Sequence, residues 1–108
     1  MPLDEANRDR IEAAAFRRLL AHLRARDDVA NVTLMGEAGF CRNCLADWLV
    51  EAAREAGVSL DRDEARLHVY GEPYEAFRAR QPPATPEQLA RMEASLAENR
   101  RRGTNAHG

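Results

Sequence analysis

The stretch FCRNCLADWLVEAAREAG, residues 40–57, decides the fold of this chain. On a helical wheel of about 100° per residue, its apolar side chains gather on one face. Gly57 is typical of the position just after a helix C-terminus. The stretch therefore predicts the most apolar helix of the chain, at the centre of the domain. The predicted apolar face holds Cys41, Cys44, Leu45, Trp48, Leu49, Ala52 and Ala56.

The rest of the chain also follows helical periodicity, and no run alternates long enough to indicate a strand. A first long helix is expected from Asp4 or Asn7 to about Arg26, and His22 falls inside its apolar arc. A capping box and a proline at the first helical position predict short helices over 61–70 and 73–80. Thr85-Pro-Glu-Gln88 predicts the start of a C-terminal helix over about 86–102.

Residues 29–35 fit two local structures. They could form a short strand or a short helix capped by Asn31. Because no partner strand is expected elsewhere, we expect a helical turn here, followed by a bend between Gly36 and Gly39.

A chain of 108 residues has room for one hydrophobic core. We therefore expect one all-α domain over 1–108, a compact bundle of two long helices, several short ones and a C-terminal helix. Residues 103–108 are expected to be a disordered tail.

Composition narrows the classes of partner and the location. The formal net charge of −2 argues against binding to nucleic acid or to an anionic membrane, since both favour a basic face. No apolar run approaches the roughly 20 residues of a membrane span, and no secretory signal is evident. The expected location is the cytoplasm, where thiols stay reduced.

Several short motifs carry a family resemblance. They are AAFRRL (14–19), DVANV (28–32), AGFCRNCL (38–45), EAA (51–53), DEAR (63–66) and VYGEPYE (69–75). Through these motifs the chain resembles the short bacterial proteins grouped as domain of unknown function 1244, over roughly residues 10–81. The resemblance implies a small all-helical fold and no particular activity.

Cys41 and Cys44 are the one candidate site with a physical rationale. On a helix, residues three apart project to the same face, and their α-carbons lie within the range of a disulfide. Both would lie in the first helical turn, where the helix dipole stabilises a thiolate, and Arg42 adds a positive charge.

Three interpretations of this pair stay open. Both thiols could simply be small buried apolar groups near Trp48. They could form a dithiol redox site, since helical alkyl hydroperoxidases also carry Cys-x-x-Cys on a helix, with an upstream acid that Glu37 would match. They could bind zinc or iron together with His22, although one cysteine pair leaves the tetrahedral ligand set of zinc incomplete.

Two classes of function follow. The first is a non-enzymatic helical module that binds another protein or a further copy of itself. The second is a thiol redox or metal-binding protein centred on Cys41, Cys44 and His22. The sequence favours the first, and no catalytic constellation or phosphate-binding loop is evident.

Overall fold

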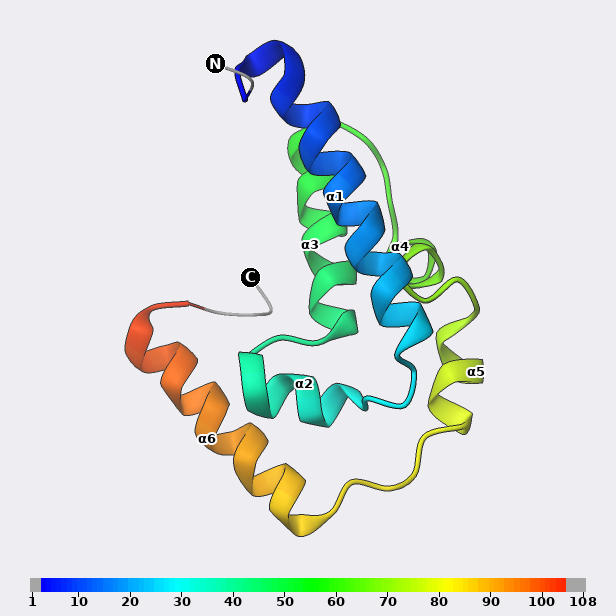
Figure 1. Cartoon of the computed structure of the whole chain (residues 1–108). Coiled ribbons are helices and arrows are strands. Elements are labelled where there is room, and N and C mark those ends of the chain that lie inside the picture. The colour runs from blue at the N-terminus through cyan, green and yellow to red at the C-terminus, as the bar shows by residue number, and fades with distance from the viewer. Residues whose placement is uncertain (1–2, 105–108) are drawn as a thin grey trace.

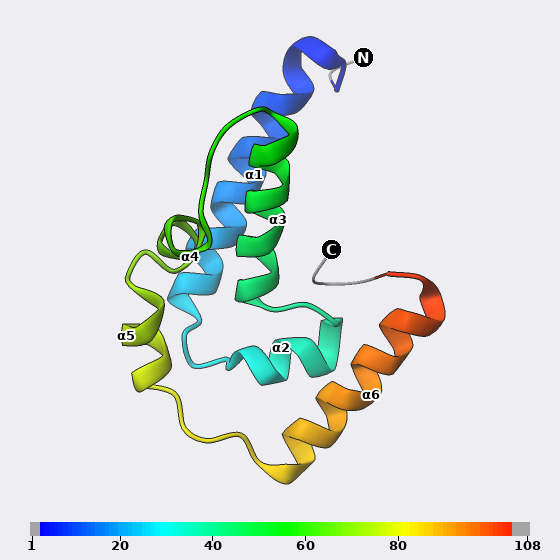
Figure 2. The same cartoon turned by 180° about the vertical axis from the view of Figure 1, so that it is seen from behind.

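A computed structural model describes residues 3–104 of the chain. In that range the chain is helical and contains no strand, as the sequence predicts. The N-terminal helix is the longest, and the central helix is shorter. The C-terminal helix is close in length to the central one and ends the described part of the chain (Figures 1 and 2). The helices are α1 (Glu5–Ala25), α2 (Asn31–Ala38), α3 (Arg42–Glu55), α4 (Arg62–Tyr70), α5 (Tyr74–Ala79) and α6 (Pro86–Arg102).

Local capping explains most helix starts. Asp4 accepts hydrogen bonds from the backbone N–H groups of Ala6 and Asn7, and so caps α1. The expected capping boxes are present at α4, with Asp61 and Glu64, and at α6, with Thr85 and Gln88. These pairs satisfy N–H groups that would otherwise lack an intrahelical partner. The predicted starts of α4 and α6 are therefore confirmed.

The segment after α1 differs from the expectation. It forms a full helix, α2, whose N-cap is Ala30 rather than Asn31. Gly36 lies inside α2, so the predicted bend begins only at Gly39, which ends the helix with a left-handed φ of 75°. Asn31 instead donates a hydrogen bond to the Tyr70 hydroxyl at 2.9 Å.

The main core lies where α4 meets α1 and α3. Helix α4 packs against both longer helices and connects them. Phe16, Leu49 and other half-buried side chains extend this core. Its buried members are Leu20, Leu23, Leu45, Ala46, Ala65, Val69, Tyr70 and Phe77.

The bundle is more open than the compact one expected. Its radius of gyration is 15.3 Å, whereas a compact chain of this length has about 13 Å. Helix α6 lies along α2, away from the main core, and the N-terminal part of α1 extends at the opposite end of the molecule (Figures 1 and 2). None of the helices in residues 3–104 has the length and apolarity to span a lipid bilayer.

Candidate functional site

Cys41 and Cys44 lie at the start of α3, close to the positions that the sequence predicts. Cys41 is the N-cap residue, with extended backbone angles of φ −141° and ψ −175°, so it precedes the helix. The side chains are 6% and 0% exposed. Their sulfurs are 3.8 Å apart and are thiols rather than a disulfide. The expected juxtaposition of the two side chains is therefore present.

A third sulfur atom lies beside the two cysteine sulfurs. The Sδ atom of Met35, on α2, lies 3.8 Å from Cys44 Sγ, and Met35 is itself buried. The left-handed turn at Gly39 reverses the chain after α2, so that α3 starts beside the residues that α2 buries. We call Met35, Cys41 and Cys44 the sulfur cluster. Apolar side chains that pack around it are Leu34, Phe40, Met92 and Leu96.

The surroundings of Cys44 favour its neutral thiol. Its hydrogen bond with the Cys41 thiol raises the pKa of Cys44 far above the usual range, and burial raises it further. This direction is the reverse of the one expected from the helix dipole. A backbone hydrogen bond with Cys41 lowers the pKa but does not outweigh the other two effects. Cys44 is therefore a poor nucleophile in this arrangement.

Arg42 does not lie beside the thiols as a surface charge. Its side chain is 2% exposed and turns toward the C-terminal end of α1. The guanidinium donates to the carbonyl oxygens of Leu23, Arg26 and Val29 and to Asn31 Oδ1, at 2.8 to 3.1 Å. These acceptors are neutral oxygens, and burial lowers the pKa of Arg42. Sequence reasoning missed this buried arginine.

His22 is exposed on α1 and not buried within an apolar surface, contrary to the sequence expectation. Within residues 3–104, no three His, Cys, Asp or Glu side chains are grouped so that they could hold a metal ion. The three-residue site of Cys41, Cys44 and His22 is therefore not assembled in this structure. The cause is that α1 buries only Leu20 and Leu23, so most of its apolar arc, including the side of His22, stays open.

Glu37 and Trp48, which the sequence places near the thiols, have partners of their own. Glu37 pairs with Arg91 of α6, with 2.7 Å between Oε1 and Nε, and both side chains are largely exposed. Trp48 stacks on Phe40, with ring centroids 5.9 Å apart. Glu37 thus takes part in docking α6, and Trp48 covers the side of the sulfur cluster that Phe40 forms.

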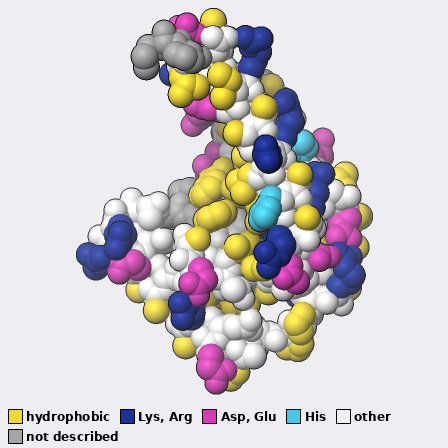
Figure 3. Space-filling view, viewed as in Figure 1, with side chains coloured by type: hydrophobic (Ala, Val, Ile, Leu, Met, Phe, Trp, Pro, Cys, Tyr) yellow, Lys and Arg dark blue, Asp and Glu magenta, His cyan; other side chains and the backbone are white. Residues whose placement is uncertain are grey.

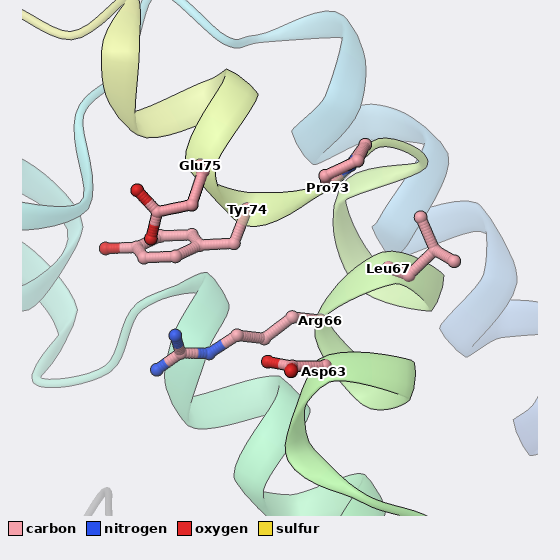
Figure 4. A pocket seen from close by; sticks show the side chains of 6 residues that line it. All are labelled: Asp63, Arg66, Leu67, Pro73, Tyr74 and Glu75. Carbon is pink, nitrogen blue, oxygen red and sulfur yellow. The ribbon is translucent and has the colours of Figure 1, made fainter.

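A shallow pocket of about 350 Å³ lies between α4 and α5 (Figure 4). Arg66 stacks over the Tyr74 ring at 4.5 Å from its centroid. Asp63 and Glu75 also line the pocket, so one cation faces two carboxylates. This lining gives no excess of positive charge for an anion, and the sulfur cluster remains the stronger candidate site.

A comparison with protein families identifies the class of protein. Residues 29–94 match the family described as a protein of unknown function (DUF1244). The chain belongs to this family. The match covers more than half of the chain, so the resemblance seen in the sequence is confirmed, although over a range shifted toward the C-terminus.

The matched range tells which features belong to the DUF1244 domain. It contains the whole sulfur cluster, Arg42 and the first half of α6, whereas α1 lies outside it. The family description assigns no activity. No match is found among the curated proteins. The function therefore has to be argued from the geometry of the chain.

Proposed function

We propose that this DUF1244 protein is a non-enzymatic helical module that associates with a second copy of itself. The observation that carries the proposal is its large surface. The chain exposes 7609 Å², whereas a compact monomer of this mass exposes about 6,000 Å². A standard interface hides about 800 Å² on each partner. The chain therefore exposes about 1,600 Å² more than a compact monomer does, and this excess is larger than the area that one interface hides on each partner.

The exposed apolar side chains of α1 and α3 indicate where the second copy binds. Ile11 and Leu19 of α1 are 47% and 37% exposed, and Trp48 of α3 is 39% exposed. Figure 3 shows hydrophobic side chains gathered over α3 and the adjoining side of α1. We call Ile11, Leu19 and Trp48 the apolar face. On both helical wheels these residues flank the side that faces the main core.

The N-terminal half of α1 needs such a partner. No residue between Glu5 and Leu19 is buried, and Phe16 is the member of this stretch that packs against the main core, so about three turns before it lack a packed core beneath them. An isolated helix of this length is marginal in water, because most helix stability comes from packing of an apolar side. Pairing of two apolar faces would supply that packing.

The environment of the thiols supports a non-enzymatic role. Cys44 is held neutral, which disfavours a thiolate nucleophile. The proposed cytoplasmic location rests on the sequence, since a reducing compartment keeps thiols such as these reduced.

The test is the mass of the protein in solution. Light scattering at concentrations above about 10 µM should give twice the chain mass of 12.1 kDa. Leu19→Glu and Trp48→Glu should each give the monomer, because each places a charge in the apolar face. Both positions are partly exposed, so the monomeric variants should still fold, and any loss of helical content should be confined to the N-terminal half of α1.

The matched control is Leu67→Glu. Leu67 is 51% exposed on α4 and lies outside the apolar face, so this variant should remain a dimer. A monomeric wild type at these concentrations would overturn the proposal. Equal dissociation by all three variants would overturn the assignment of the face.

A further inference from the structure

The two sulfur–sulfur separations around Cys44 match those of a metal site. A metal–sulfur bond is about 2.3 Å long, so two ligating sulfurs lie about 3.8 Å apart at a tetrahedral angle and about 4.0 Å apart at a trigonal angle. Both measured separations are 3.8 Å, from Cys44 Sγ to Cys41 Sγ and from Cys44 Sγ to Met35 Sδ. Cys44 thus stands at ligand distance from two other sulfurs.

Three sulfur donors, two from cysteine and one from methionine, favour a soft metal ion. Zinc in proteins takes thiolate, imidazole and carboxylate ligands, and a thioether is not among them. Thiolates together with a thioether favour monovalent copper. The apolar shell of Leu34, Phe40 and Leu96 contributes no oxygen ligand that a harder ion would require.

The charges around the cluster complement such a complex. Two thiolates and one monovalent ion carry a net charge of −1. The cluster lies at the N-terminus of α3, where the helix dipole favours negative charge. The buried guanidinium of Arg42, which hydrogen-bonds to neutral oxygens, interacts electrostatically with Cys41. Asp27 and Asp28 also interact favourably with this guanidinium, and a bound anionic complex would add a further negative charge near it.

We infer that the sulfur cluster binds one Cu(I) ion through the thiolates of Cys41 and Cys44 and the thioether of Met35. Binding replaces two S–H bonds by two Cu–S bonds and releases both protons to solvent, while the Met35 sulfur donates a lone pair. No electron is transferred. The inference goes beyond self-association and does not depend on it, and it replaces the zinc or iron site with His22 that the sequence suggested.

The experiment is a titration of the reduced full-length protein with Cu(I), supplied without oxygen as its coloured bicinchoninate complex. The wild type should remove one Cu(I) per chain from the chelator. Cys41→Ser and Cys44→Ser should each abolish this transfer. Met35→Leu should lower the affinity at least ten-fold, and it should fold, because exchange between methionine and leucine conserves volume.

Met92→Leu is the matched control. Met92 packs against the same cluster from α6, but it is not assigned as a ligand, so its replacement should leave the affinity unchanged. X-ray absorption of the wild-type complex should show three sulfurs at about 2.3 Å, which tests the site without any variant.

Three results would overturn the inference. The first is an unchanged affinity in Met35→Leu, and the second is an equal loss in Met92→Leu. The third is an absorption spectrum with oxygen or nitrogen in place of the third sulfur.

Discussion

At the scale of single residues, Arg42 organises the junction of three helices. Its guanidinium donates to Leu23 O and Arg26 O at the end of α1, to Val29 O in the connection, and to Asn31 at the start of α2. The last carbonyls of a helix have no intrahelical partner and favour a nearby cation. Arg42 therefore supplies hydrogen bonds to carbonyl oxygens at the end of α1, one of which, Arg26 O, also accepts from the Val29 N–H group.

Replacing this guanidinium should weaken the fold. We expect Arg42→Lys to lower the free energy of unfolding by about 2 kcal/mol, because an ammonium group cannot reach all four acceptors and a buried unpaired carbonyl is costly. Urea denaturation measures the change. The control Arg54→Lys, at an exposed position of α3, should alter stability by less than about 0.5 kcal/mol. Equal stability of the two variants would contradict the role given to Arg42.

Residue patterns predicted local features better than distant ones. The capping boxes of α4 and α6 involve residues three apart, so the sequence alone predicts them. The burial of Arg42 depends on carbonyls 13 to 19 residues away in sequence, which no local pattern signals. Met35 was missed for a similar reason, because a methionine within an apolar segment is typical of any core.

At the scale of helices, α6 packs over the sulfur cluster. It buries no residue of its own, and it reaches the cluster through Met92 and Leu96. Gly36 allows the close approach of α2 and α6, since a Cβ there would lie 3.2 Å from Arg91 Cγ. Asn99 Nδ2 donates to Gly39 O at 2.9 Å. The exposed pair of Arg91 with Glu37 adds little stability.

Loosening α6 should therefore expose the thiols. Asn99→Ala removes one partly buried hydrogen bond, worth about 1 kcal/mol, which raises the population of the opened form about five-fold. The labelling rate of Cys41 and Cys44 by an aromatic disulfide in the native protein should rise by the same factor. Glu93→Ala, at an exposed position of α6, should leave the rate unchanged. A rate in Asn99→Ala equal to that of the wild type would show that α6 does not limit access.

The helices themselves were largely predictable, whereas the sides they bury were less so. Periodicity predicted the long helices, and Gly57 correctly marked the end of α3. The helical wheel of α1 placed His22 in the apolar arc. The apolar arc of α1 is wider than the surface that α4 covers, so part of the arc stays exposed. Only the tertiary structure shows which part.

At the scale of the whole molecule, the open shape is the feature that sequence reasoning did not foresee. The expected compact bundle followed from chain length and composition, which say nothing of how far α6 and the start of α1 extend from the core. The measured radius of gyration of 15.3 Å and the exposed apolar face both describe a chain with more surface than one small core needs. The self-association that we propose would account for both.

Hydrogen exchange along the N-terminal half of α1 tests this account most directly. Backbone amides of residues 9–19 should exchange slowly at a protein concentration that favours the dimer. On dilution they should exchange at least ten-fold faster, while the amides of α4 should not change. Fast exchange in residues 9–19 that is the same at both concentrations would contradict the account, because it would show that no second copy covers the apolar face.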